Sequence, residues 1–227
     1  MSDVQRNRVK NLAQKYIDGN NPSGWFEELY ATAQGDKDAI PWAKLTINPH
    51  LANWIEQNPH QGVGKTALVV GCGLGDDAEA IAKLGYQTVA FDISPTAIAW
   101  CKQRFPDSQV NYLVDDLLQP SVLTERKFDF VVESYTLQAL PATVRHRAIA
   151  QLPQFVAPQG RLLIICRGRE LDEPEGELPW HLTIEELAEL EVLGLKQVAL
   201  EDYLDGLNNT VRYFRLEYLA YSTGESA

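Results

Sequence analysis

The sequence predicts an α/β fold built on a doubly wound, mostly parallel sheet. From Thr66 onward, short apolar runs alternate with segments of helical spacing, and several of the runs end in a glycine or an acidic residue. The 227 residues, 45% of them hydrophobic, are enough for one domain with its own core and an appendage. Ligands in such sheets bind beyond the carboxyl ends of the strands, so the residues that follow each strand are the candidates for a site.

Residues 1–60 are expected to form a helical N-terminal cover, and residues 61–227 one compact α/β unit. The cover has helical spacing at residues 9–17, 25–30 and 49–58, without strand alternation. The segment GNNPSG separates the first two helices because its glycines and proline interrupt helical structure.

The α/β unit is expected to contain strands at residues 67–71, 87–91, 110–114, 128–133, 161–166, 196–201 and 212–220. Helices are expected at 78–84, 95–105 and 141–156, and after Thr183. Ser94 before Pro95, and Thr183 with Glu186 three residues later, have the pattern of helix N-caps. The segment APQG is expected to close the helix 141–156, and DYLDGLNN to join the last two strands.

Charge and composition restrict the partners. The formal net charge of -11 and the pI of about 4.8 disfavour a nucleic acid, whose phosphates an acidic surface repels. The three cysteines are scattered, and no His/Cys/Asp cluster has the spacing of metal ligands, so we expect neither a disulfide framework nor a metal site. With no apolar run of about twenty residues, no membrane segment and a cytoplasmic location are expected.

Two glycine-rich segments flank the first strand of the α/β unit. The segment GVGKT resembles a phosphate loop, but Pro59 stands where that motif needs its first glycine, and the segment precedes a strand instead of following one. GCGLG has the expected context of strand, turn and helix, which makes Gly71, Cys72, Gly73 and Gly75 candidates for a ligand-binding turn.

The residues around GCGLG favour a nucleoside without phosphates. A dinucleotide fingerprint needs a third glycine where Asp76 stands, and Asp76 with Asp77 disfavours a pyrophosphate unless both acids only cap the helix. Asp92 ends the second strand, where a carboxylate can accept hydrogen bonds from ribose hydroxyls. Asp115 or Asp116 ends the third, where a carboxylate can accept from an adenine amino group. S-adenosylmethionine, a nucleoside with a sulfonium charge, suits this set.

The segment LVVGCGLGDDAEAIAKLGYQTVAFDISPTAIAWC resembles the cofactor half of class I S-adenosylmethionine-dependent methyltransferases. VVESYTLQALPATVRHRAI and IPWAKLTINPHL are similar to segments of the thiopurine and halide/thiol methyltransferase group. Val69 replaces the acid that is common two residues before the first glycine. The resemblance implies a seven-stranded sheet with an antiparallel last strand. It also implies cofactor contacts from these residues: Gly71, Gly73, Asp92, Ile93, Asp116 and Leu117, the isoleucine and leucine flanking the adenine.

Candidates for the chemistry follow the fourth and fifth strands. Glu133 is a candidate to bind the cofactor's amino group or to act as a base, with a buried structural acid as the alternative, and Tyr135 faces the methyl group in this fold. Arg167 and Arg169 are candidates to hold an acceptor carboxylate, or they pair with nearby acids. His181 is the histidine best placed to touch substrate, and Trp180 beside it is a further candidate for substrate binding.

Trp25 and Trp42 are expected to close the pocket as an aromatic lid or to anchor the helices of the cover. The sequence therefore predicts S-adenosylmethionine-dependent methyl transfer to a small-molecule S-, O- or N-nucleophile or carboxylate. A nicotinamide-nucleotide oxidoreductase and a non-catalytic nucleoside-binding module are the alternatives, and the oligomeric state is left open.

Overall fold

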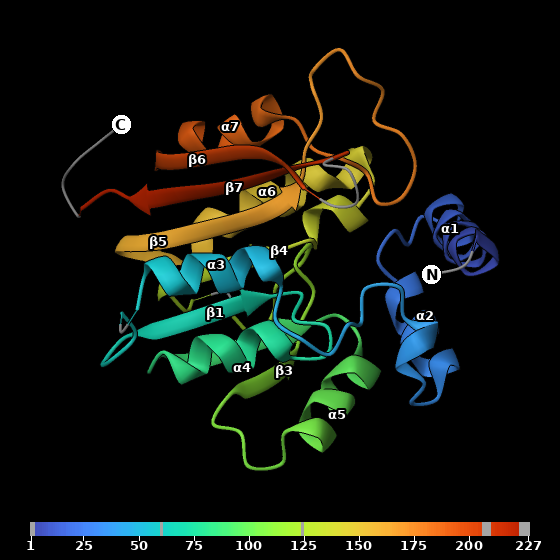
Figure 1. Cartoon of the computed structure of the whole chain (residues 1–227), viewed down its shortest axis with the longest axis horizontal. Helices are drawn as coiled ribbons and strands as arrows, with labels where there is room; N and C mark the ends of the chain where they lie inside the picture. The colour runs from blue at the N-terminus through green and yellow to red at the C-terminus, as the bar shows by residue number, and fades with distance from the viewer. Residues whose placement is uncertain (1–2, 60, 124, 206–209, 223–227) are drawn as a thin grey trace.

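A computed structural model describes residues 3–59, 61–123, 125–205 and 210–222. Its centre is one seven-stranded sheet in the order β3-β2-β1-β4-β5-β7-β6 (Figure 1). The strands are β1 (Thr66–Val70), β2 (Gln87–Asp92), β3 (Asn111–Val114), β4 (Phe128–Ser134), β5 (Val156–Arg167), β6 (Leu195–Asp205) and β7 (Val211–Ala220). Strand β7 is antiparallel to both of its neighbours, and the other pairs are parallel. The predicted fold class is confirmed.

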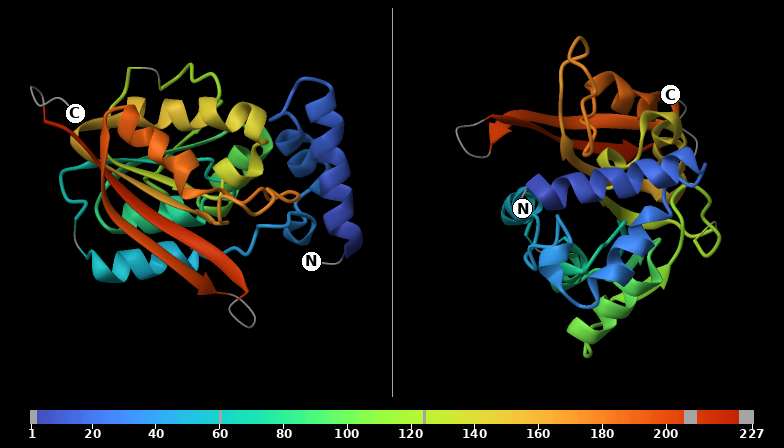
Figure 2. Two further views of the ribbon diagram at one scale, coloured as in Figure 1. Left: turned by 90° about the horizontal axis from the view of Figure 1, so that it is seen from above. Right: turned by 90° about the vertical axis from the view of Figure 1, so that its right-hand side faces the viewer.

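Helices cover both faces of the sheet. They are α1 (Asp3–Asp18), α2 (Trp25–Ala33), α3 (Pro49–Gln57), α4 (Asp76–Lys83), α5 (Pro95–Arg104), α6 (Ala142–Phe155) and α7 (Ile184–Val192), with short 3-10 turns η1 (Lys37–Ala39) and η2 (Leu137–Ala139). Figure 2 shows α6 and α7 on one side of the sheet and α3 on the other. The result is a three-layer α/β/α arrangement.

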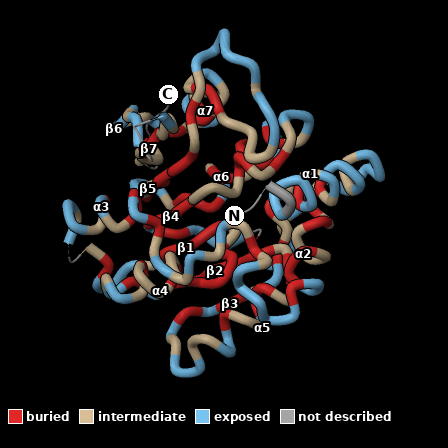
Figure 3. Tube along the Cα trace, turned by 45° about the vertical axis from the view of Figure 1, so that its right-hand side comes forward, coloured by how far each residue is buried: buried red, intermediate tan, exposed pale blue. Residues whose placement is uncertain are grey.

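Alternate residues of the central strands enter two different cores. In β1, Leu68 and Val70 pack with α6 and α7, whereas Ala67 and Val69 pack with α3, α4 and α5. Because both faces are covered, these strands are apolar throughout instead of alternating with polar residues. Buried segments therefore run along the middle of the sheet, and exposed ones lie on the outer sides of the helices (Figure 3).

The predicted helix caps are present. The Ser94 hydroxyl accepts a hydrogen bond from the backbone N–H of Ala97 at 3.0 Å. Thr183 and Glu186 form the reciprocal capping box, with distances of 3.2 and 2.9 Å. A cap of this kind contributes about 1 kcal/mol to stability.

Helices α1 and α2 lie beyond the carboxyl ends of the strands, at the right of Figure 1. They have a small core of their own around Trp25, Leu29 and Tyr30. Glu27 of α2 fastens them to α5, because its carboxylate accepts hydrogen bonds from the hydroxyls of Ser94 and Thr96, both at 2.6 Å.

Helix α3 packs with the sheet instead. The ring of Trp54 stacks on Phe130 with centroids 4.8 Å apart, and its indole N–H donates to Glu217 at 2.9 Å. The division of the chain at residue 60 stays a prediction. The contacts of α3 place it with the α/β unit. Helices α1 and α2, which project over the ends of the strands, precede α3 in the sequence.

The structure corrects one predicted boundary. APQG does not close α6, which ends at Phe155, but belongs to β5. Val156 pairs with Phe128, and the register then shifts before Arg161 pairs with Phe130. The early residues of β5 were missed because alanine, proline, glutamine and glycine lack the β-branched or aromatic side chains typical of strands. Strand β6 continues to Asp205, and residues 206–209 of the predicted connection lie outside the described part of the chain.

Among the described residues, no helix combines the length and the apolar character needed to cross a membrane. Cys72, Cys101 and Cys166 are free and buried. The described residues also contain no group of three or more side chains arranged to hold a metal ion.

Candidate active site

A cavity of about 850 Å³ lies over the carboxyl ends of the parallel strands. Its floor is formed by the turns after β1, β2, β3, β4 and β5, and its roof by α1, α2 and residues 41–50. The predicted residues on its wall are Trp25, Trp42, Gly71, Cys72, Gly73, Asp92, Ile93, Asp116, Leu117, Tyr135, Arg167 and His181. The cavity therefore contains most of the candidates that the sequence identified, although they come from eight separate segments.

The glycine turn after β1 has a backbone that glycine permits. Gly71 and Gly73 have φ of +59° and +54°. A Cβ on Gly71 would lie 2.2 Å from the Thr136 hydroxyl, and one on Gly73 would lie 3.3 Å from the Tyr30 hydroxyl. Gly75 is the N-cap of α4 and does not line the cavity. A side chain at Gly71 would clash with Thr136, and both glycines present backbone to the cavity.

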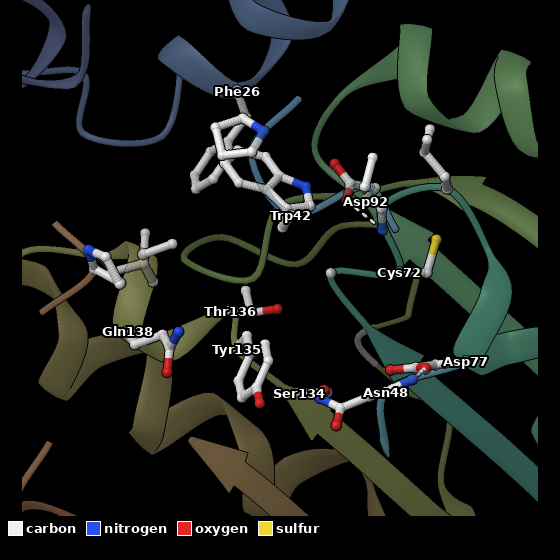
Figure 4. A pocket seen from close by; sticks show the side chains of 18 of the residues that line it. Phe26, Trp42, Asn48, Cys72, Asp77, Asp92, Ser134, Tyr135, Thr136 and Gln138 are labelled. Atoms are coloured by element: carbon white, nitrogen blue, oxygen red, sulfur yellow. Dashed lines mark hydrogen bonds between the residues drawn. The ribbon is translucent and has the colours of Figure 1, made fainter. Parts of the chain in front are cut away.

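Asp92 connects the glycine turn to the end of β2. Its carboxylate accepts hydrogen bonds from the backbone N–H groups of Gly73 and Ser94, both at 2.9 Å (Figure 4). Burial raises its pKa to about 6 despite these hydrogen bonds. The side chain is ionised at neutral pH and retains lone pairs toward the cavity, as a ribose-binding acid requires.

The structure separates the two acids that follow β3. Asp115 is buried and accepts hydrogen bonds from the backbone N–H groups of Asp116, Ser121 and Val122 at 2.9–3.1 Å, so it holds its own loop. Asp116 is half-buried on the cavity wall and accepts one hydrogen bond, from the N–H of Leu118 at 2.8 Å. Asp116 is therefore the better placed of the two to meet an adenine amino group.

The two acids that open α4 have partners within the protein. Asp76 forms a bidentate ion pair with Arg104 at 2.8 and 2.9 Å. Asp77 accepts from the backbone N–H of Asn48 at 2.7 Å, and the Asn48 amide donates to the Ser134 hydroxyl at 2.8 Å (Figure 4). Burial raises the pKa of Asp77 to about 6. These contacts tie the residue before α3 to both the glycine-turn helix and β4.

Glu133 is fully buried and does not line the cavity. One carboxylate oxygen accepts from the backbone N–H groups of Thr136 and Leu137 at 2.7 and 2.9 Å, and the other is buried without a described partner. Burial raises its pKa to about 7. Glu133 thereby fixes the turn in which Tyr135 has φ of +66° and reaches the cavity.

Six cavity residues lie beyond the glycine turn, and we call them the acceptor lobe: His50, Tyr135, Gln138, Arg167, His181 and Tyr213. Arg167 and Tyr213 are paired across β5 and β7. The Tyr213 ring lies 6.3 Å from that of Tyr135 and 4.4 Å from that of His50. The lobe has aromatic walls and one guanidinium group.

Two predicted residues of this region lie outside the cavity wall. Arg169 donates to the carbonyl groups of His181 and Glu173, at 3.1 and 2.7 Å, and so braces the loop after β5. Trp180 is half-buried and donates its backbone N–H to the carbonyl of Gln138 at 2.8 Å. Their side chains are not placed to touch a ligand in the cavity.

The two tryptophans of the cover have different positions. Trp25 is fully buried and stacks on Phe26 at 4.0 Å between centroids, as an anchor of the small core. Trp42 is 37% exposed and donates its indole N–H to the Tyr30 hydroxyl at 2.8 Å. Figure 4 shows Phe26 and Trp42 together across the cavity from Tyr135 and Thr136.

Comparison with known proteins identifies this arrangement. Residues 67–160, which carry the glycine turn, Asp92 and Asp116, match the family described as "Methyltransferase domain". Over 200 residues the chain is 25% identical to "Probable thiol methyltransferase 2" of Arabidopsis thaliana, covering 85% of this chain and 82% of that protein. Residues 67–160 are a methyltransferase domain, on a sheet with the fold of class I methyltransferases. The methyltransferase prediction is thus confirmed over the oxidoreductase alternative.

Other similar proteins agree with this family. Nodulation protein S of Sinorhizobium fredii is 32% identical over 123 residues, which span 49% of this methyltransferase and 56% of that protein. The structure of the N-methyltransferase NodS from Bradyrhizobium japonicum, in complex with S-adenosylhomocysteine, has a TM-score of 0.64. It is 21% identical and covers 86% of this chain and 97% of its own.

The cofactor of such methyltransferases is S-adenosylmethionine, and the residues present fit it. Gly71 and Gly73 line the cavity, and neither has a side chain that could block a ligand there. Acids, and not basic residues, follow β2 and β3 on the cavity wall, which suits a nucleoside without phosphates.

Sequence reasoning missed His50, Asn48 and Tyr213. His50 Nδ1 and the Tyr203 hydroxyl share a hydrogen bond of 2.5 Å. Burial lowers the pKa of His50. The Asn-Pro pair before it is a helix-start signal that could have placed Asn48 at the entry of α3. No local signal could have placed His50 beside Tyr203, because 153 positions separate them.

Proposed function

We propose that this methyltransferase transfers the methyl group of S-adenosylmethionine to a nucleophile on a small molecule bound in the acceptor lobe. One observation carries the proposal: a single roofed cavity runs from the glycine turn and Asp92 to Tyr135, Arg167 and His181. Its volume of about 850 Å³ suits a cofactor and a small acceptor together.

The proposed cofactor residues have separate tasks. Gly71, Cys72 and Gly73 present backbone to the methionine part, Asp92 accepts from the ribose hydroxyls, and Asp116 accepts from the adenine amino group. Ile93 and Leu117 flank the adenine. Glu133 and Gly75 do not line the cavity, so we propose that they position other residues and do not contact the cofactor. Glu133 holds the turn after β4, and Gly75 forms the start of α4.

When bound, the cofactor supplies a methyl carbon made electrophilic by the sulfonium. An acceptor held in the lobe would form its new bond to that carbon as the carbon–sulfur bond breaks, and the bonding electrons would stay on sulfur. The chain's contribution is alignment and exclusion of water, which can lower a barrier by roughly 7–11 kcal/mol. Trp42 and Phe26 close the cavity, and Tyr135 lies on its wall at the turn after β4, where it would help to align the acceptor.

An amine, thiol or hydroxyl acceptor also gives up a proton. Burial, and then the charge of Arg167, lower the pKa of His181, so this imidazole is neutral at pH 7 and able to accept a proton. The names of the similar proteins, a thiol methyltransferase and an N-methyltransferase, favour sulfur and nitrogen nucleophiles.

Calorimetric titration with S-adenosylhomocysteine and with NAD tests the cofactor, and we expect binding of the first alone. A screen of small thiols, amines, phenols, halides and carboxylates, read by S-adenosylhomocysteine release, then tests turnover. Binding without turnover of any acceptor would favour the nucleoside-binding module. No binding of S-adenosylhomocysteine would refute the proposal. The expected cytoplasmic location and the expected absence of a nucleic-acid partner stay predictions.

A further inference from the structure

Arg167 lies on the wall of the acceptor lobe and forms no ion pair with any residue that the structure describes. Among the described residues, none accepts a hydrogen bond from its guanidinium group, and its Nε is buried without a partner. A buried donor of this kind costs free energy unless something pairs with it. The observation points to a ligand group that completes the site.

The guanidinium groups of neighbouring arginines do have acceptors within the protein. Arg145 pairs with Glu175 and Glu186 at 2.5 and 2.6 Å. Arg169 donates to three backbone carbonyl groups and lies 3.7 Å from a Glu186 carboxylate oxygen. Arg212 pairs with Asp202 and Glu170. The sequence made Arg167 and Arg169 equal candidates, and the structure distinguishes them by their partners.

The backbone of Arg167 is held rigidly. Its N–H donates to the side-chain oxygen of Gln138 at 2.7 Å, and its carbonyl accepts from the N–H of Leu182 at 3.0 Å. The residue also pairs with Tyr213 across β5 and β7. A guanidinium on such a base is pre-organised, so little entropy is lost when it binds a ligand.

Arg167 also contributes to the electrostatic character of the lobe, where Asp205 lies 3.8 Å from His50 Nε2. Its charge contributes to lowering the pKa of His181, where burial is the larger cause, and it opposes the burial that raises the pKa of Tyr135. His181 and His50, whose pKa burial also lowers, are therefore neutral at pH 7. Lys10 at the cavity wall pairs with Glu177.

We propose that Arg167 binds a carboxylate of the methyl acceptor, an inference that rests on the proposed function. A carboxylate matches the planar guanidinium fork. The aromatic rings of Tyr135, Tyr213 and His50 suit a flat, apolar body attached to it. The acceptor class is thus a small carboxylic acid that carries its nucleophile elsewhere.

The carboxylate is the anchor and not the methylated group. Methylation removes the charge of a carboxylate nucleophile, so Arg167 would then bind the ground state more tightly than the transition state and slow the reaction. An anchor keeps its charge throughout, and its binding energy aligns a different atom with the methyl carbon.

Matched acceptor pairs test this assignment in the full-length protein. The pairs are mercaptoacetate with 2-mercaptoethanol, 3-aminobenzoate with aniline, and 4-hydroxybenzoate with phenol. We expect the carboxylate of a pair to be preferred about 10- to 100-fold in kcat/KM, and Arg167→Gln to abolish that preference. Arg167→Lys should restore part of it. Arg147→Gln, which removes an exposed arginine of α6, is the charge-matched control and should behave as the wild type.

Binding is measured independently of turnover, by titrating the S-adenosylhomocysteine-loaded protein with benzoate and with benzyl alcohol. Tighter binding of benzoate that Arg167→Gln removes would support the assignment even if none of the pairs is methylated.

Three results would overturn the assignment while leaving the proposed function in place. The first is an unchanged preference, or unchanged benzoate binding, in Arg167→Gln. The second is a weaker affinity of that variant for S-adenosylhomocysteine itself, which would make Arg167 a cofactor residue. The third is a methyl ester as the product by mass spectrometry. Failure of the wild type to bind S-adenosylhomocysteine would instead refute the proposed function.

Discussion

Replacing Glu133 with glutamine should make the protein more stable at alkaline pH. The carboxyl group is fully buried, and its pKa of about 7 lies above the ordinary value of 4.5. Each pKa unit corresponds to about 1.4 kcal/mol, so ionisation in the folded state costs about 3 kcal/mol. Because the folded pKa is raised, the wild type is most stable below pH 4.5 with respect to this group and loses that stability as the pH rises to about 7.

Glutamine keeps the oxygen that accepts from Thr136 and Leu137 and cannot ionise. At pH 5 we therefore expect the free energies of unfolding of Glu133→Gln and the wild type to differ by less than about 1 kcal/mol. At pH 8 the free energy of unfolding of the variant should be higher by about 1–3 kcal/mol. Urea unfolding of the variant and the wild type at several pH values measures these two differences. Glu56→Gln, an exposed position on α3, is the control and should show no such change.

A stability difference that is the same at pH 5 and pH 8 would show that Glu133 does not titrate in this range and would refute the reasoning. The same variant also separates the two roles predicted for Glu133. Retained methyl transfer is expected if Glu133 only holds the turn, and loss of activity in a stable variant would restore it as a catalytic candidate.

Further predictions concern the cofactor site and one helix cap. Gly71→Ala should weaken S-adenosylhomocysteine binding more than about 10-fold by calorimetry, because its Cβ would collide with Thr136 at 2.2 Å and the φ of +59° disfavours alanine; unchanged affinity would contradict the placement of the turn. Asp92→Asn should weaken the same binding by about 10-fold or more. In the wild type, affinity should fall as the pH drops through about 6, where Asp92 gains a proton and loses its charge, and a flat profile between pH 5 and 8 would count against Asp92 as the ribose acceptor. Thr183→Ala should lower the free energy of unfolding by about 1 kcal/mol in urea through loss of the capping box with Glu186, with Thr183→Ser as the rescue variant.

Local patterns were sufficient to predict the fold and to bring the glycine turn and Asp92 to one cavity. Asp92 and the glycine turn each follow an apolar run, and the parallel arrangement of β1 and β2 brings their ends together. Such features depend on the order of residues along one short segment, which a single sequence contains. The start of α7 was predictable for the same reason, since Thr183 and Glu186 are neighbours in the sequence.

The acceptor half depends on packing, and sequence could not resolve it. Arg167 and Arg169 have the same type and context, and only the fold shows that one is braced by carbonyl groups and the other faces the cavity. Glu133 ends β4 as predicted, yet its side chain turns toward the backbone of η2. His50 meets its partner Tyr203 only after the whole sheet has formed.

The hydrogen bonds of Glu27 link the projecting helices to Asp92 through one residue. Ser94 donates a hydrogen bond from its hydroxyl to Glu27 and another from its backbone N–H to Asp92, so both contacts meet at the start of α5. A chain trimmed to the sheet and its flanking helices would keep Asp92 and the glycine turn but lose the carboxylate that holds the Ser94 hydroxyl. The N-terminal helices therefore support one wall of the cavity in addition to forming its roof.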